Sequence, residues 1–443
     1  MSDRAPLALG AGFFYPGGEH VTGWRGRSGE PENYLDLAYY ARFAQTAEAG
    51  RFATIFVADE LYVWDRFTSG IDHGVNVRPE PFTLLGAMSQ LTTKIGLAAT
   101  VSTTYNQPYH VARKLASLDH LSHGRAAWNL VTSASDEEAR NFGRDSNLDH
   151  SVRYRRGEEF VDVVTGLWDS WDDDAFRYDR ASGIFADRAK LHVLDHHGEF
   201  LSVRGPLNIP RPPQGHPPLF QAGASEAGRE LAGRTAEAVF TISPFDIPGA
   251  RALYDDYKNR AVAAGRGAGD LLVLPALSPI IGRTDAEAED LFRELASLTP
   301  DRVSLDLLSH HLGEDLSSRD PDEVFRFDFD LESFQQSKTV YASIEKLVSK
   351  RDYTIRELYT ELLRRRFVLG TPDSLANHIG ERYEQRAADG FILMFPTLPD
   401  TIEQFVAEIV PRLTDRGIHA SEYAGDTLRE NLGLARPAGR YAA

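Results

Sequence analysis

Short apolar runs alternate with longer segments of helical spacing along most of this chain. The apolar runs have the length and the Ala, Val, Ile, Leu and Phe content of buried strands. They cover residues 6–14, 53–58, 95–101, 126–132, 218–224, 238–242, 271–281 and 391–395. The segments between them predict helices at 35–49, 81–91, 108–121, 153–171, 225–233, 250–264, 286–298 and 401–413, with a further helix capped at Thr371.

The order of these elements predicts a (β/α)8 barrel of the TIM type. Eight strand–helix alternations are typical of that fold, whereas an open doubly wound sheet rarely needs eight such strands. Two stretches depart from the pattern, and we expect them to be insertions after strands four and seven: about 172–216, with a hairpin near 196–203, and about 300–367. Residues from about 418 to 443 are expected to form a tail. The chain, 1–443, is thus predicted to be a single barrel domain.

The unit at residues 218–233 is the first candidate site. Its strand ends in small residues, and Ser225 is well placed to cap the helix that follows. The first turn of a helix presents free backbone N–H groups at a positive dipole end, where phosphate is a frequent ligand. The other interpretation is an ordinary strand–helix turn with a good cap.

Polar residues at the ends of other strands would face the same end of a barrel. Asp59 follows the second strand, where it either accepts from a ligand or serves as a cap or ion-pair partner. The run 102–104 follows the third strand and Asn129 lies in the fourth. His150 and Tyr154, four residues apart, share one face at the start of a helix. They are either a second wall of the anion site or a solvated helix start.

Charge and composition narrow the classes of partner. The chain carries 48 basic and 65 acidic side chains, giving a formal net charge of −17, and no basic run offsets it. Nucleic acid and anionic membrane surfaces are therefore unfavourable partners. Cysteine is absent, which excludes disulfides and thiolate chemistry. The first thirty residues lack a signal pattern and no apolar run reaches membrane-spanning length, so we expect a cytoplasmic protein.

Motifs for metals and dinucleotides are missing. The adjacent histidines at 196–197 and 310–311 would point to opposite faces of a strand, and there is no His-Glu-x-x-His run. There is no Walker loop, and the glycines at 10 and 12 lack the third one of a dinucleotide fingerprint. We expect no metal.

Five longer segments together resemble one family. They are TYNQPYHVARKLASLDHLSHGRAAWNLVTS, ARNFG, RYRRGEEFVDVVTGLWDSW, VRGPLNIPRPPQG and QAGASEAGRELAGRTAEAVFT. In this order they are similar to the nitrilotriacetate monooxygenase/dibenzothiophene-sulfone monooxygenase group of the bacterial-luciferase-like flavin monooxygenases. The resemblance covers residues 6–245 and, more loosely, the eighth strand.

The resemblance implies a TIM barrel that binds reduced FMN, activates O2 and oxygenates a small organic substrate. It also implies a separate NAD(P)H-dependent flavin reductase as partner, and a homo-oligomer (dimer or tetramer). The FMN-binding residues carried over are Asp59, Thr100, Asn129, His150, Tyr154 and Ser225. Ser225 and Tyr154 would hold the phosphate and Asn129 would lie near the ring, while Ser102 or Thr103 would replace Thr100 if the third strand ends earlier. On the substrate side, His20, Tyr62 and His311, or its neighbour His310, are the candidate catalytic residues.

Three other functions remain open from the sequence. A deazaflavin-dependent oxidoreductase of the same superfamily would keep the barrel and change the cofactor. A metal-dependent barrel hydrolase would need a metal that the motifs do not provide for. A non-catalytic binding protein would leave the FMN positions without a purpose.

Overall fold

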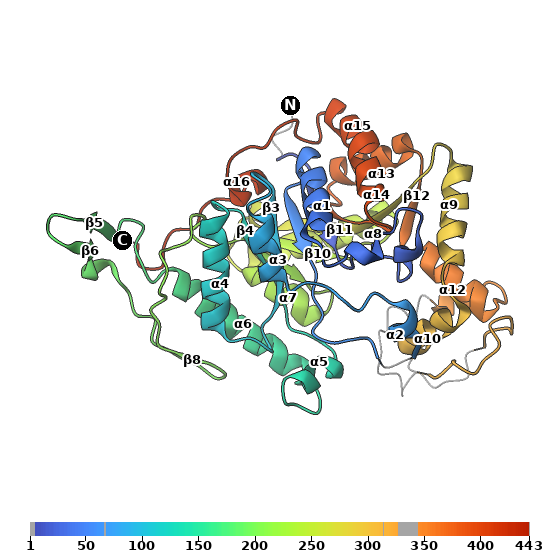
Figure 1. The fold of residues 1–443 in the computed structure, drawn as a ribbon, viewed down its shortest axis with the longest axis horizontal. Coiled ribbons are helices and arrows are strands. Elements are labelled where there is room, and N and C mark those ends of the chain that lie inside the picture. The colour runs from blue at the N-terminus through green and yellow to red at the C-terminus, as the bar shows by residue number, and fades with distance from the viewer. Residues whose placement is uncertain (1–4, 66–67, 313, 327–343, 443) are drawn as a thin grey trace.

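A closed barrel of eight parallel strands forms the centre of the molecule (Figure 1). The computed structural model describes residues 5–65, 68–312, 314–326 and 344–442. The barrel strands are β1 (Ala8–Phe13), β2 (Thr54–Val57), β3 (Gly96–Ser102), β4 (Ala126–Val131), β9 (Leu219–Ala222), β10 (Ala238–Thr241), β11 (Leu272–Ile281) and β13 (Gly390–Met394). All eight match predicted runs, so the predicted (β/α)8 fold is confirmed.

Pairing between β10 and β11 closes the barrel. Each strand is paired in parallel with its two neighbours, from β1 through β4 to β9, β10, β11 and β13 and back to β1. Most residues of these strands are buried because one face packs inside the barrel and the other packs under the helices. At the start of β13 only glycine fits, since a Cβ on Gly390 would lie 1.8 Å from the carbonyl oxygen of Ala8.

Helices follow the strands at the predicted positions, and further helices occur that the sequence pattern does not predict. They are α1 (Leu37–Ala49), α2 (Thr68–His73), α3 (Pro81–Met88), α4 (Pro108–Leu121), α5 (Asp136–Asn141), α6 (His150–Trp168), α7 (Glu226–Thr235), α8 (Ile247–Ala263), α9 (Asp285–Ser297), α10 (Asp301–Leu312), α12 (Ile355–Arg364), α13 (Pro372–Glu384), α14 (Asp400–Gln404), α15 (Val410–Asp415) and α16 (Leu428–Leu432). The predicted caps are confirmed, because Ser225 accepts from the N–H of Gly228 and Thr371 from that of Ser374. The helix predicted at 401–413 contains a π-helical turn, Phe405–Ile409, just before Pro411, which cannot donate a helical hydrogen bond.

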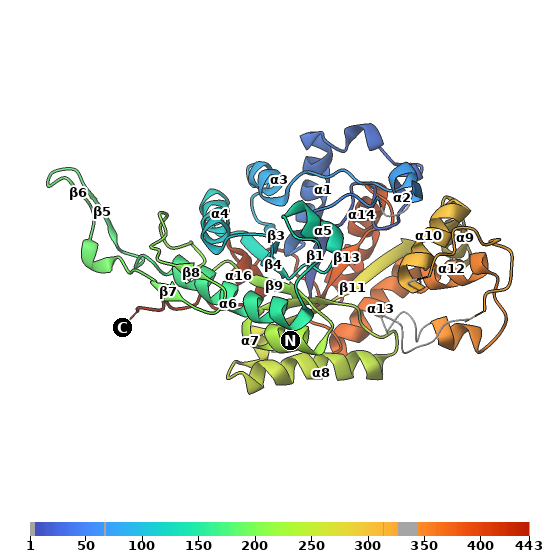
Figure 2. The same cartoon turned by 90° about the horizontal axis from the view of Figure 1, so that it is seen from below.

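Two segments extend from opposite ends of the molecule. Between α6 and β9 lie two hairpins, β5 (Phe176–Asp179) with β6 (Ile184–Ala186) and β7 (His196–His197) with β8 (Ser202–Val203). The second is the hairpin predicted near 196–203, and the first projects far from the barrel (Figures 1 and 2). At the other end, α9, α10 and α12 share a separate core.

The stretch 300–367 contains elements that the sequence pattern does not reveal. It includes α10 and α12, while residues 313 and 327–343 lie outside the described residues. It also leads into β12 (Phe367–Gly370), which pairs with Ser278–Ile281, the part of β11 that extends beyond the barrel. A four-residue strand that follows three arginines gives no alternating signal of its own.

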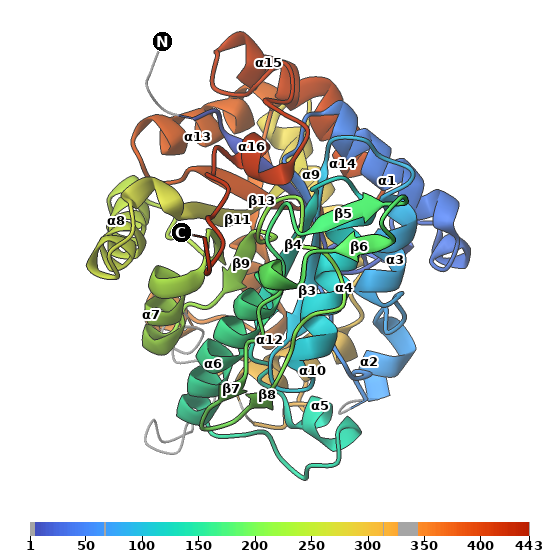
Figure 3. The ribbon, with the colours of Figure 1, turned by 90° about the vertical axis from the view of Figure 1, so that its left-hand side faces the viewer.

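The C-terminal segment, predicted as a tail, is packed. Leu428, Leu432 and Leu434 are buried together with residues at the strand starts, among them Ala8 and Ala53. The short helix α16 therefore closes the amino-terminal end of the barrel, and it crosses in front of the strands when that side faces the viewer (Figure 3). Among the described residues, no helix combines the length and the apolar character needed to cross a membrane.

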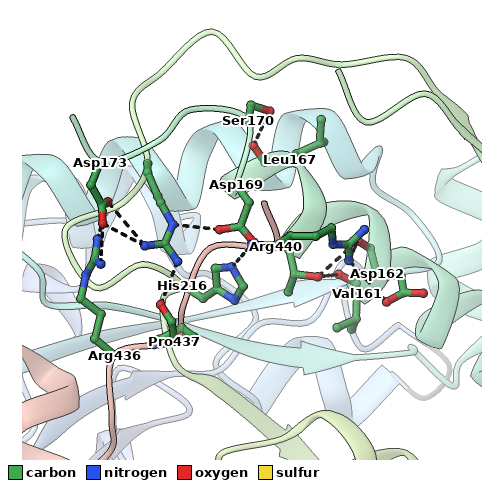
Figure 4. A network of polar contacts seen from close by, with 12 residues as sticks. Val161, Asp162, Leu167, Asp169, Ser170, Asp173, His216, Arg436, Pro437 and Arg440 are labelled. Atoms are coloured by element: carbon green, nitrogen blue, oxygen red, sulfur yellow. Dashed lines mark hydrogen bonds and ion pairs between the residues drawn. The ribbon is translucent and has the colours of Figure 1, made fainter. Parts of the chain in front are cut away.

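A buried ionic network holds this segment in place (Figure 4). Asp169, at the end of α6, is 4% exposed and accepts from Arg211 Nε at 2.8 Å, His216 Nε2 at 3.0 Å and the backbone N–H of Arg440 at 3.0 Å. Arg211 also donates to the carbonyl oxygen of Pro437. Burial alone would raise the pKa of Asp169, but the hydrogen bonds from His216 and Arg211 hold it below its ordinary value.

We predict that Asp169→Asn lowers the free energy of unfolding by about 3–5 kcal/mol at pH 7, because it leaves the buried Arg211 without its main counterion. Since the folded-state pKa of Asp169 is depressed, its contribution is present above the unfolded pKa of about 4 and is lost as the pH falls through the folded value. The difference between wild type and variant in denaturant titrations should therefore shrink in acid. Asp174→Asn, which removes a surface partner of Lys190, is the control and should change stability little. Equal stability of the two variants at pH 7 would contradict the prediction.

Candidate active site

A cavity of about 580 Å³ opens at the carboxyl ends of the barrel strands. Its wall comes from the loops after β1, β2 and β10, from β11 and β13, and from α10, α12 and α13. Aromatic side chains make up much of it, including Phe14, Tyr62, Trp64, Phe240 and Tyr359. The cavity is also lined by acidic and basic residues, including histidines. These are Glu19, His20, Glu60, Arg78, His310, Arg365, Arg366, His378 and Arg382.

Thr100 and Asn129 form a buried polar pair on neighbouring strands. They are directly paired in the register of β3 and β4, and Asn129 Nδ2 donates to Thr100 Oγ1 at 2.8 Å. The Thr100 hydroxyl in turn donates to the carbonyl oxygen of Val57 at 2.6 Å. These two consecutive hydrogen bonds fix the orientation of the Asn129 amide. Asn129 Oδ1 is buried and has no hydrogen-bond partner among the described residues, so it is free to accept from a ligand.

Ser225, Tyr154 and His150 lie together at the start of α7. The Ser225 hydroxyl caps the helix by accepting from the N–H of Gly228 at 3.1 Å, and it lies 3.4 Å from the hydroxyl of Tyr154. The rings of His150 and Tyr154 are 4.7 Å apart, as expected for residues four apart on one helix face. The structure thus brings together the three residues from which an anion site was predicted, and their role stays a prediction.

Close packing brings Tyr154 onto this turn. A Cβ on Gly228 would lie 3.0 Å from the Tyr154 hydroxyl and 3.1 Å from the Cα of Gly223, so a side chain here would press on both. Arg156, two residues further along α6, lies on another face of the helix with its guanidinium over the ring of Phe160, and its buried Nη1 has no partner among the described residues. The corner beside Ser225 therefore combines helix N–H groups with two hydroxyls.

Asp59 lies after β2, next to a charged cluster. Burial raises its pKa to about 6, against the opposing effect of Arg78. The same Arg78 pairs with Glu60 at 3.1 Å and lies over the ring of Tyr15, with the guanidinium carbon 4.7 Å from the ring centre. Tyr62, from the same loop, lines the cavity, and burial raises its pKa to about 12. The loop thus contributes neutral or paired groups to the wall.

His20 is held neutral in the first loop. It is 3% exposed, and burial, followed by the charge of Arg366, lowers its pKa to about 3. Its ring nitrogens contact the Thr22 hydroxyl at 3.2 Å and the Thr299 hydroxyl at 3.4 Å. Beside it, Glu19 pairs with Arg366. At neutral pH His20 can therefore donate or accept a hydrogen bond but carries no charge.

Not all of the predicted substrate-side residues line the cavity. His20 and Tyr62 line the cavity, and of the adjacent histidines on α10 it is His310 that lies in its wall. Burial lowers the pKa of His311 to about 4. Of the two histidines, His310 is thus the one that faces the cavity, and a catalytic role for either stays a prediction. The predicted cofactor-binding residues are not among the residues that line this cavity. Thr100 and Asn129 form one group, and His150, Tyr154 and Ser225 form a second.

Several charged residues of the cavity were missed by sequence reasoning. Arg78 comes from a loop, Arg366 from the turn between α12 and β12, and Arg382 from the last turn of α13. The three consecutive arginines at 364–366 were the available signal, but they lay in a stretch interpreted as an insertion. Among the described residues, no group of three or more His, Asp or Glu side chains could hold a metal ion.

Similarity to known proteins extends over the whole chain. Residues 19–390 match the family described as luciferase-like monooxygenase. The chain is 42% identical to N-acetyl-S-(2-succino)cysteine monooxygenase of Bacillus subtilis (strain 168), over 100% of this chain and 99% of that protein. It is also 42% identical to nitrilotriacetate monooxygenase component A of Aminobacter aminovorans, covering 97% of each.

The fold has solved counterparts. The crystal structure of a riboflavin lyase with modified FMN and riboflavin superposes with a TM-score of 0.85 at 32% identity, over 97% of this chain and 96% of that one. The family resemblance of the sequence segments is thereby confirmed along the full length. The chain belongs to the luciferase-like monooxygenase family.

Proposed function

We propose that this chain is the oxygenase component of a two-component system that uses reduced FMN and O2 to oxygenate a small organic substrate. A separate NAD(P)H-dependent flavin reductase would supply the reduced flavin. The observation that carries the proposal is the end-to-end similarity to a relative named as component A of its monooxygenase. The local geometry of the two residue groups supports it.

The corner formed by α6 and α7 fits a phosphate. The first turn of α7 offers backbone N–H groups and a positive dipole end, and the hydroxyls of Ser225 and Tyr154 are 3.4 Å apart there. These groups would hold the FMN phosphate. The chain as a whole carries −17, so the local donors must overcome an unfavourable long-range field.

The Asn129–Thr100 pair fits the polar edge of a flavin ring. Its orphaned Oδ1 needs a donor, and a ring N–H would provide one. The bond from Asn129 Nδ2 to Thr100 keeps that oxygen aimed in one direction before any ligand arrives. When bound, reduced FMN would supply the electrons that activate O2.

The residues of this chain would then orient the substrate and exclude water. Aromatic side chains of the wall, such as Phe14 and Phe240, present an apolar surface beside the strand ends. His20 stays neutral and can hold a proton at one ring nitrogen while its other nitrogen accepts. Tyr62, with its raised pKa, keeps its hydroxyl proton at neutral pH and can donate it in a hydrogen bond.

The phosphate corner predicts a difference between FMN and riboflavin. In anaerobic titrations, Ser225→Ala and Tyr154→Phe should each weaken binding of reduced FMN about tenfold, because each removes one hydrogen bond to a charged group. Binding of reduced riboflavin, which has no phosphate, should not change. Thr284→Ala removes the same kind of helix cap from α9 and serves as the control. Wild type that binds the two flavins equally well would exclude a phosphate site.

The proposed contact between Asn129 and the flavin ring predicts a different result, an equal loss of affinity for both flavins. Asn129→Ala should weaken reduced FMN and reduced riboflavin by the same factor, about tenfold, because the lost contact lies on the ring that both share. Isothermal titration of both flavins against this variant measures the factor. A loss confined to FMN would place Asn129 at the phosphate instead.

The two-component proposal predicts how turnover depends on its reductants. Chemically reduced FMN and O2, without nicotinamide, should transfer labelled oxygen to a substrate, tested first with N-acetyl-S-(2-succino)cysteine and nitrilotriacetate. NADH alone should give no product, and NADH with a flavin reductase should restore it. Mass spectrometry of the products reads the label. Turnover with a reduced deazaflavin but not with FMN would favour the deazaflavin alternative.

A further inference from the structure

The charge of the cavity is opposite to that of the chain. Its wall contains four arginines, Arg78, Arg365, Arg366 and Arg382, but only two carboxylates, Glu19 and Glu60. Both carboxylates are already paired, Glu60 with Arg78 and Glu19 with Arg366. The positive charge of the other two arginines is therefore not balanced by the carboxylates of the wall, in a protein whose net charge is −17.

Arg382 is the unusual member of this set. It lies in the last turn of α13 and is 6% exposed. Its terminal nitrogens contact the backbone carbonyl oxygen of Phe245 and, at 3.2 Å, His378 Nδ1. Burial lowers the pKa of His378 to about 4, so at neutral pH this histidine accepts a hydrogen bond without supplying charge.

No carboxylate of the described residues lies within ion-pair distance of Arg382. Glu381 and Asp246 favour its charged form only at longer range, against the effect of burial. A buried guanidinium without a counterion is costly, and removal of the charge would relieve that cost. Arg365 differs, because it pairs with Glu361 at 3.1 Å and is partly exposed. The cavity thus has one buried cation with neutral partners.

The surroundings of this cation are apolar. Phe245 and Ile242, residues that are 58% and 82% exposed, line the cavity, and Pro275 and Phe367 face it as well. Exposed side chains of this size in a cavity wall are normally covered by an apolar ligand. A guanidinium beside such a surface matches a planar carboxylate carried on an apolar body.

We propose that the substrate of this enzyme is an organic carboxylate with an apolar body, and that Arg382 binds its carboxylate group. This inference rests on the proposed function in one respect, that the cavity is the substrate pocket. It identifies the class of substrate, which the fold alone does not determine.

The test compares matched charged and neutral probes. Phenylsuccinate and its dimethyl ester, and 2-naphthoate and 2-naphthamide, are titrated into the full chain by calorimetry, anaerobically, with and without reduced FMN. In wild type each carboxylate should bind about tenfold more tightly than its neutral partner. Arg382→Gln should abolish that preference without weakening the neutral probes. Arg283→Gln, which removes an exposed arginine paired with Glu287, is the matched control and should preserve it.

Arg382→Lys keeps the test decisive if the glutamine variant does not fold. It retains the charge but not the two-pronged geometry, so carboxylate binding should weaken several-fold while ester and amide binding stay unchanged. Equal affinity of charged and neutral probes in wild type would overturn the proposal. So would an unchanged preference in both Arg382 variants, or no binding of any probe at millimolar concentration.

Flavin titrations on the same samples separate this inference from the proposed function. Arg382→Gln should bind reduced FMN as tightly as wild type, because Arg382 is not part of the predicted flavin group. If wild type does not bind reduced FMN but still prefers the carboxylate probes, only the oxygenase proposal is rejected. Intact flavin binding with no carboxylate preference would reject the substrate inference alone.

Discussion

The hydrogen-bonded closure of β10 against β11 is the constraint on which the rest of the structure depends. It leaves the eight barrel strands without a free edge, and because all of them are parallel, their carboxyl ends meet on one rim. Tyr15, Asn129, Ser225 and Met394 are far apart in the sequence but belong to or directly follow strands that closure brings together. The groups of the cavity wall that do not follow a barrel strand, such as Arg382, depend on further packing.

Local sequence signals were sufficient for the barrel and for the cap at Ser225. Strands of the barrel are buried on both faces and give continuous apolar runs, and the cap depends only on residues within one helical turn. Helix periodicity likewise placed His150 and Tyr154 on one face. Their position beside Ser225 is a contact between distant segments, and the family resemblance, not a local signal, led to that expectation.

The cavity charges could not be predicted in the same way. Arg382 reaches the wall only because α13 follows β12, and β12 exists because β11 continues beyond the barrel and offers Ser278–Ile281 as a pairing edge. Nothing within four residues of Phe367 indicates that partner. Glu19 likewise receives its counterion, Arg366, from more than three hundred residues away. Such pairings depend on tertiary contacts between segments with no shared local pattern.

The closure of the barrel by α16 has a consequence for the order of folding. Leu428, Leu432 and Leu434 share one buried cluster with Ala8 and Ala53, from which they are separated by most of the chain. Contacts between residues so far apart in sequence are slow to form, because the entropy of closing a long loop opposes them. Until these leucines dock, the amino-terminal end of the barrel stays exposed to water, and the partly folded protein presents an apolar opening there.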